Sequence, residues 1–187
     1  MYPNPSSFIP LIIGSTDGPT LTAAAAASCI PVANRLILPT NYWQIGKAWK
    51  VLVAGRISNV ITTPGTFRLD FRTGPSGTII AHDSGAIALN AMAAKTTVPF
   101  VYELDLVCRA VGNGTATTLL GIGKITSEAV SQAVAAPLTA VAMAPAGAPA
   151  VGTGFDNTAA NAVDFFFTQT VATGSFTVHQ LSIWESI

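Results

Sequence analysis

Charged side chains are scarce in this chain, which has 9 Lys+Arg and 9 Asp+Glu among 187 residues and a formal net charge of zero. An ordinary soluble domain is about a quarter charged. The scaling of surface with mass gives a folded chain of this size roughly 8,400 Å² of surface, or about 470 Å² per charge. A surface with so few charges suits a freely soluble monomer poorly. The composition therefore indicates either a membrane protein or a protein whose surface is covered by other protein.

A long uninterrupted apolar segment is also missing. A membrane-spanning helix needs about 20 mostly apolar residues, and only the uncharged stretch between Glu128 and Asp156 reaches that length. Its prolines, Pro137, Pro145 and Pro149, each disrupt a helix interior. The opening residues, MYPNP, carry no positive charge and do not indicate a secretory signal. The sequence thus predicts a protein made in a cytoplasm, with no membrane partner.

Residues that bind metals or carry out catalysis are few. The two histidines, His82 and His179, and the two cysteines, Cys29 and Cys108, form no cluster with zinc-ligand spacing. Two cysteines make no disulfide framework, although a single bridge between them stays open. Lysine and arginine are thinly spread and matched by acid, so no basic patch for nucleic acid is indicated. We therefore predict a non-enzymatic protein with no cofactor, no metal and no direct nucleic-acid partner.

Two residue pairs keep a hydrolase hypothesis open. Glu103 and Asp105 fall two apart on one face of a predicted strand, about 7 Å from each other, a spacing that suits the paired acids of a glycosidase. The favoured interpretation is a cross-strand charge ladder with arginines on neighbouring strands, namely Arg56, Arg68 or Arg72. The second pair, His82 and Asp83, lies at a strand end where the acid would orient the imidazole, but no nucleophile elbow accompanies it.

An aromatic group keeps a carbohydrate-binding hypothesis open. Tyr42, Trp43 and Trp49 precede or begin the first predicted strand of the main domain. Exposed aromatic rings stack on pyranose rings, whereas packing in the core is the commoner fate of Trp in a sandwich. These three residues are the candidates for ligand stacking.

The chain does contain many short segments in which apolar and polar residues alternate, separated by Gly, Pro and Asn turn signals. They predict strands over 47–57, 66–72, 78–82, 99–109, 115–124, 163–171 and 175–185. In these strands, apolar residues are predicted to face inward and charged ones outward. The predicted inward residues are Trp49, Val51 and Val53, then Phe67, Leu69 and Phe71, and finally Phe100, Tyr102, Leu104, Leu106 and Cys108. The predicted outward residues are Arg68, Asp70 and Arg72 on the second of these strands and Glu103, Asp105 and Arg109 on the third. The run Phe165–Phe167 predicts burial on both faces. Seven or eight strands without a long amphipathic helix predict an all-β, antiparallel β-sandwich, jelly-roll in preference to immunoglobulin-like.

Two parts of the chain fit this pattern less well. Residues 1–40 are rich in proline and predict an extended N-terminal arm, with one or two helical turns over Ala23–Ala27. Residues 41–187 form the predicted sandwich domain, which includes an apolar Ala/Pro/Gly loop at about 128–155. Long structureless loops in compact domains are uncommon unless functional or disordered. Because this loop is apolar, we favour a loop that packs on a neighbouring subunit over a floppy insertion.

Two stretches carry a resemblance to a known family. One is FVYELDLVCR (100–109) followed by GNGT (112–115), and the other is FDNTAANAVDF (155–165) continuing to FTVHQLSIWE (176–185). Together they resemble the C-terminal half of β-sandwich virion proteins of tailed bacteriophages, of the capsid-decorating or head-fibre type. The motifs are turn and strand patterns and cover about half of the chain. Residues 1–40 and the Ala/Pro insertion match nothing in that family.

The resemblance implies a non-enzymatic structural protein of the virion that decorates or cements a capsid. The implied partners are the major capsid protein and copies of the chain itself, with a homotrimer favoured, and closed symmetry would hide low-charge surface. The expected contact residues lie in the N-terminal arm and the apolar loop: Phe8, Ile9, Leu11, Ile12, Ile13, Val134, Leu138, Val141 and Met143. The alternative function is a carbohydrate- or receptor-binding module of a phage fibre or tail, using Tyr42, Trp43 and Trp49.

Overall fold

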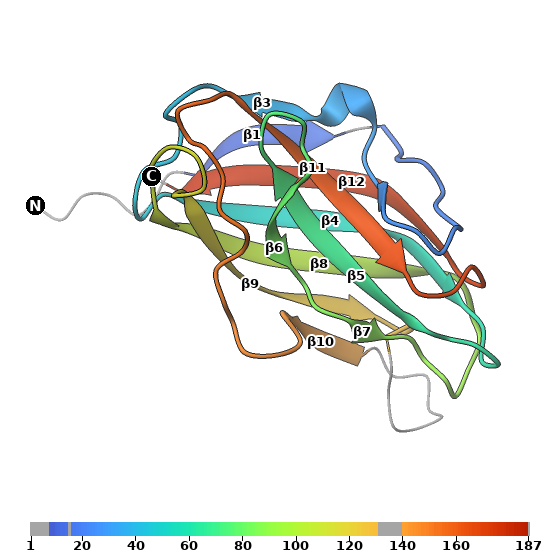
Figure 1. The fold of residues 1–187 in the computed structure, drawn as a ribbon. Coiled ribbons are helices and arrows are strands. Elements are labelled where there is room, and N and C mark those ends of the chain that lie inside the picture. Colours follow the sequence, from blue (N-terminus) through green and yellow to red (C-terminus); the bar gives the residue numbers. More distant parts are fainter. Residues whose placement is uncertain (1–7, 15, 131–139, 187) are drawn as a thin grey trace, which may run out of the picture.

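The computed structural model describes residues 8–14, 16–130 and 140–186, which form two antiparallel β-sheets packed face to face (Figure 1). No α-helix occurs within these ranges. The strands are β1 (Phe8–Gly14), β2 (Ala27–Ser28), β3 (Leu36–Leu38), β4 (Ala48–Asn59), β5 (Thr66–Thr73), β6 (Ile79–Asp83), β7 (Ile87–Ala88), β8 (Lys95–Ala110), β9 (Thr118–Ser127), β10 (Ala140–Ala144), β11 (Asn161–Gln169) and β12 (Ser175–Ser186), with a short 3₁₀ helix at Val32–Asn34. The prediction of an all-β sandwich is confirmed.

The order of the strands identifies the topology. Sheet A has the order β1-β12-β4-β8-β9-β10, and sheet B has β2-β11-β5-β6, with β3 paired to β11 and β7 to β5. If β7, β9 and β10 are set aside and β2 and β3 are counted as one strand, eight strands remain in chain order. Sheet A then reads first, eighth, third, sixth, and sheet B reads second, seventh, fourth, fifth. This interleaved order of two Greek keys is a jelly roll.

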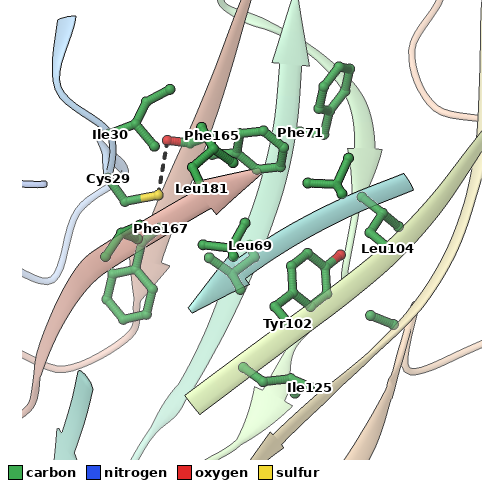
Figure 2. Packing of buried hydrophobic residues seen from close by; sticks show 14 of the residues in the cluster. Cys29, Ile30, Leu69, Phe71, Tyr102, Leu104, Ile125, Phe165, Phe167 and Leu181 are labelled. Carbon is green, nitrogen blue, oxygen red and sulfur yellow. Dashed lines mark hydrogen bonds between the residues drawn. The ribbon is translucent and has the colours of Figure 1, made fainter. Parts of the chain in front are cut away.

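Alternation along the strands places the core between the two sheets. The inward residues predicted on β4, β5 and β8 are all buried, among them Trp49, Phe71 and Tyr102. Figure 2 shows residues from both sheets meeting in this layer. Each such side chain removes apolar surface from water, which stabilises the fold by about 1.5–3 kcal/mol for a fully buried large residue. The core therefore depends on both sheets being present.

Four phenylalanines connect the sheets directly. Phe100 of β8 stacks on Phe176 of β12 with ring centroids 4.5 Å apart. Phe176 stacks in turn on Phe167 of β11 at 4.1 Å, and Phe167 lies 5.8 Å from Phe67 of β5. Offset and stacked aromatic pairs contribute beyond their buried area, by about 0.5–1.5 kcal/mol each. This column ties two strands of sheet A to two of sheet B.

The three consecutive phenylalanines of β11 do not all face the core. Phe165 and Phe167 point inward and are buried, while Phe166 points outward and is only partly covered. The Arg72 guanidinium lies 3.9 Å from the centre of the Phe166 ring and covers it. The prediction of apolar burial on both faces is therefore wrong for this strand, because a cation on the neighbouring strand replaces a second apolar layer.

The first forty residues, where described, belong to the sandwich. β1 pairs with β12 over Phe8–Gly14 and forms one edge of sheet A. β2 and β3 both pair with β11 in sheet B. The predicted helical turns over Ala23–Ala27 do not form, since these residues lead into β2. The extended arm is thus built into the jelly roll as its first and second strands, because β12 and β11 each have a free edge to pair with.

The apolar loop is also tied to both sheets. Its residues 140–144 form β10, which pairs with β9 and makes the other edge of sheet A. Further on, the Gly152 amide donates to Leu119 of sheet A at 3.0 Å, and the Thr153 amide donates to Ile80 of sheet B at 2.9 Å. The segment that follows β10 is therefore hydrogen-bonded to both sheets. In the described ranges, no helix is long and apolar enough to cross a membrane.

Candidate functional site

The outward side of sheet A carries a set of side chains that the register places in rows across the strands. Lys50, Asp105 and Ile122 form one row on β4, β8 and β9. A second row contains Leu52, Glu103, Lys124 and Met143, and a third contains Ala54, Val101, Thr126 and Val141. On the other side of these rows, Ile13 of β1 lies opposite Ser182 of β12, which is the partner of Leu52. We call this outward surface the sheet A face.

The sheet A face is open and exposes several large apolar side chains beside its charged ones. The exposed fractions of Val101, Ile122, Val141 and Met143 are 38%, 44%, 59% and 57%. A shallow depression of about 310 Å³ lies over the first two rows, between the aliphatic and charged side chains. Large apolar side chains gathered on an exposed sheet typically mark a surface that contacts another molecule.

Two ion pairs cross the middle of the sheet A face. The Glu103 carboxylate accepts from the Lys124 ammonium at 2.8 Å, and Lys50 lies 3.9 Å from Asp105. The hydrogen bond from Lys124 lowers the pKa of Glu103, and the same bond raises the pKa of Lys124. The cross-strand ladder predicted for these two acids is present, but its partners are lysines of β9 and β4 and not the predicted arginines.

The glycosidase interpretation of Glu103 and Asp105 finds no support in this geometry. A general acid in such an enzyme needs a carboxyl group whose pKa is raised, so that it holds a proton near neutral pH. The pKa of Glu103 moves in the opposite direction, because Lys124 stabilises the charged form. The pair is arranged as a charge ladder on an open sheet.

The second hydrolase pair is separated by the sheet itself. His82 points into the core, where its Nε2 lies 3.2 Å from the Tyr102 hydroxyl, and only 3% of the residue is exposed. Burial lowers the pKa of His82 to about 4. Asp83, the next residue along β6, points outward and accepts from Arg68 at 2.9 Å. Neighbours in a strand face opposite sides, so this carboxylate does not orient the imidazole.

The three candidate stacking residues are not available to a sugar. Trp43 and Trp49 are 2% and 1% exposed and pack on each other with centroids 4.6 Å apart. Tyr42 is half-buried, accepts a hydrogen bond from Trp49 Nε1 at 2.9 Å and donates to Glu185. The Lys47 ammonium covers the tyrosine ring at 3.8 Å. The tryptophans pack in the core, which was the commoner fate expected for them, and the alternative of exposed stacking rings finds no support here.

The predicted contact residues divide between surface and core. Ile9 and Ile13 of β1 are 45% and 68% exposed, whereas Leu11 and Ile12 pack against the core. The backbone of Phe8 begins β1 opposite Ser186. Val141 and Met143 lie on the sheet A face, and Val134 and Leu138 lie outside the described residues. The sequence analysis did not single out Leu52, Val101 or Ile122, although strand alternation opposite the buried residues would have located them.

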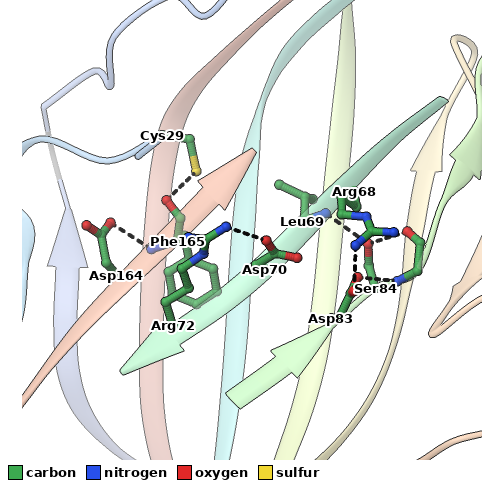
Figure 3. A network of polar contacts seen from close by, with 10 residues as sticks. Cys29, Arg68, Leu69, Asp70, Arg72, Asp83, Ser84, Asp164 and Phe165 are labelled. Carbon is green, nitrogen blue, oxygen red and sulfur yellow. Dashed lines mark hydrogen bonds and ion pairs between the residues drawn. The ribbon is translucent and has the colours of Figure 1, made fainter. Parts of the chain in front are cut away.

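The outward side of sheet B has a different character. Arginine and aspartate alternate there, with Arg68 bound to Asp83 and Arg72 bound to Asp70, each at 2.9 Å or less (Figure 3). Asp70 points outward as predicted but is only 1% exposed, since its neighbours cover it. Burial raises its pKa, against the opposing effect of Arg72. The outward side of sheet B thus carries alternating charges of both signs, whereas the sheet A face carries exposed aliphatic side chains beside its ion pairs.

Other functional chemistry is sparse in the described ranges. They contain no group of three or more His, Cys, Asp or Glu residues placed to hold a metal ion. Cys29 and Cys108 are both buried free thiols and do not form the bridge that the sequence left open. Cys29 donates its S–H to the Phe165 carbonyl at 3.2 Å, and burial raises its pKa far above the usual range, so it remains a protonated core residue.

Comparison with known proteins returns no match for this chain among family models, curated proteins or solved structures. The case for a function therefore depends on the surface of the jelly roll and on the residues that the register brings together on the sheet A face.

Proposed function

We propose that this protein is a non-enzymatic structural subunit of a virion, which decorates or cements a phage capsid by contacts with the major capsid protein and with copies of itself. The observation that carries the proposal is the sheet A face, which exposes large apolar side chains on β1, β8, β9 and β10 of one sheet. Contact between proteins is the use that fits such a surface, whereas an enzyme site needs a concave pocket with converging polar groups.

The scarcity of charge supports the same conclusion at the level of the whole surface. The molecule exposes 8808 Å² and carries 18 charged side chains, about one per 490 Å². Several of these are used within the fold, as in the buried pair of Arg72 with Asp70. Surface that is neither charged nor strongly polar interacts poorly with water, so its burial against another protein is favourable.

The jelly roll suits a cementing role because its shape is held by contacts between distant parts of the chain. The first strands, β1 and β2, pair with the last two, β12 and β11. The sheet A face is therefore a rigid platform, which reduces the ordering cost of association. A protein that binds only the assembled shell stabilises that shell by mass action.

We assign the shell contact to the β1 side of the sheet A face. Ile13 is 68% exposed and points outward from this edge strand, and Ile9 is also exposed. Pro10 interrupts the strand, and a bulge lies between it and Ile12. Both features restrain strand-to-strand aggregation at a sheet edge while the apolar side chains remain available.

The test uses particles isolated from the host that carries this protein. We expect the protein to co-sediment with these particles, and purified protein to rebind to particles that have been stripped of it. Ile13→Lys should weaken rebinding at least tenfold, because it places a charge in an apolar contact. The matched control is Ile37→Lys on β3 of sheet B, a residue 63% exposed, which should leave binding unchanged. Absence of the protein from purified particles would refute the proposal.

A further inference from the structure

We infer that the part of the sheet A face on β4, β8, β9 and β10 binds the same surface of a second copy of this chain, about a two-fold axis that runs along the strands between β8 and β9. The inference rests on the proposed function in one respect, since both take this face to be covered by protein. It goes further in naming the occupant and the register.

The charges favour a second copy as the occupant. The ion pairs in the middle of the face hold two cations and two carboxylates, and a partner that presents both signs there complements them. A two-fold axis between β8 and β9 exchanges these two strands, which places Glu103 of each copy opposite Lys124 of the other. With the bond of 2.8 Å already present inside each copy, four charges then alternate around the axis. Each charge would have two neighbours of opposite sign, which offsets the cost of removing it from water.

The apolar residues follow the same symmetry. The axis exchanges β4 with β10, so Met143 lies opposite Leu52 of the second copy and Val141 lies opposite Ala54, because each pair shares a row of the register. Likewise Val107 lies opposite Leu120. Two positions are mismatched: Val101 lies against Thr126, and Asp105 lies against Ile122 while Lys50 of its own chain stays beside it.

The packing of sheets accommodates this arrangement. Stacked sheets rotate by about 30° relative to each other because each sheet is twisted. Positions near the centre of the interface move least in such a rotation, and Glu103 and Lys124 lie in the middle one of the three rows, on the two strands next to the axis. The contacts that select the register are therefore the least affected by twist.

The size of the surface sets the expected strength. Four strands about 4.8 Å apart, each taken over seven residues although β10 has only five, cover at most roughly 450 Å² per copy. An interface of this size belongs to the weak and reversible class. We therefore expect a weak dimer that dissociates on dilution. The β1 edge, with Ile13, lies outside the paired strands and remains free for a shell. The symmetry is two-fold and not the trimer that the resemblance implies.

The experiment uses charge reversal in both directions. Glu103→Lys and Lys124→Glu each put like charges around the axis, so each variant alone should dimerise at least tenfold more weakly than the unchanged protein. Mixed in equal amounts, the two should form a heterodimer at least as tight as the unchanged dimer, because the two cations of one copy then face the two carboxylates of the other. Sedimentation velocity from about 1 to 300 μM measures all three, and circular dichroism checks that each variant is folded.

The matched control is the pair Arg68→Glu and Asp83→Lys on sheet B. It breaks an ion pair of similar exposure, with side chains 43% and 37% exposed, and changes net charge by the same amounts. Each control variant should dimerise like the unchanged protein. A protein that stays monomeric at 300 μM would overturn the inference, as would a trimer, or a mixture of the sheet A variants that does not recover association. Particle binding by the monomeric variants separates this failure from a failure of the proposed function.

Discussion

At the residue scale, His82 shows how a polar side chain is placed in the core of this jelly roll. It lies against Gly121 of β9, where an added Cβ would come within 2.3 Å of the imidazole Nδ1. Because Gly121 of sheet A has no side chain, the imidazole of His82 from sheet B fits in the space beside it. Burial then lowers the pKa of His82 to about 4, against a weaker raising effect of Asp83.

This environment predicts a specific pH dependence of stability. The unfolded state takes up a proton below about pH 6.5, whereas folded His82 does so only near pH 4. Stability from neutral His82 is therefore complete above pH 6.5 and is lost as the pH falls from there to 4, by up to about 3 kcal/mol. Urea unfolding of the unchanged protein and of His82→Gln, at pH 7 and at pH 4.5, measures this. The unfolding free energy of the unchanged protein minus that of His82→Gln should be smaller at pH 4.5 than at pH 7.

The comparison between the two proteins isolates the histidine. Asp70 and Asp164 have raised pKa values because of burial, so their protonation acts in the opposite direction as the pH falls. Both carboxylates are retained in the variant, and their contributions cancel in the difference. A difference that is constant from pH 7 to 4.5 would contradict a buried neutral His82. Alternation along β6 predicts only that His82 and Asp83 face opposite sides. The pKa itself depends on Gly121 and Tyr102, which pairing of distant strands brings to the ring.

At the element scale, the strands that lie between turn signals were the predictable ones. β4, β5, β8, β11 and β12 agree with the alternating segments of the sequence to within a few residues. β1 and β10 could not be recognised in this way, since FIPLIIG and AVAMA contain no polar alternation. They become strands because the exposed backbone edges of β12 and β9 supply hydrogen-bond partners, and such long-range pairing is not encoded locally.

The two isoleucines in the middle of β1 distinguish a strand of the sandwich from a loose arm. Ile12 packs against the core, and Ile13 is 68% exposed. Ile12→Asp should lower the unfolding free energy by about 2–4 kcal/mol, because it buries a charge without a partner. Ile13→Asp is the control and should change stability by less than about 0.5 kcal/mol. Denaturant unfolding measures both, and equal small effects would mean that β1 does not pack on the sandwich in solution.

At the scale of the whole molecule, the two outer faces differ in kind. Sheet B presents alternating Arg and Asp side chains, and sheet A presents aliphatic ones around a small charged centre. The overall shortage of charge was evident from composition, but the clustering of exposed aliphatic side chains on sheet A was not. It follows from which strands share a sheet: β8, β9 and β10 meet in sheet A, and their outward residues Val101, Ile122 and Met143 become neighbours only there.

The apolar character of the sheet A face predicts the heat capacity of association. Burial of about 900 Å² in total, some 65% of it apolar as in homodimer interfaces, gives a heat capacity change of about −0.2 kcal/mol/K from the usual area coefficients. Calorimetric dilution of concentrated protein at 10, 20 and 30 °C measures this value with opposite sign. Contact through the charged face of sheet B would bury mainly polar surface and give a change near zero or positive. A clearly negative heat capacity change of association that persists in Arg68→Glu and disappears in Lys124→Glu would place the contact on sheet A.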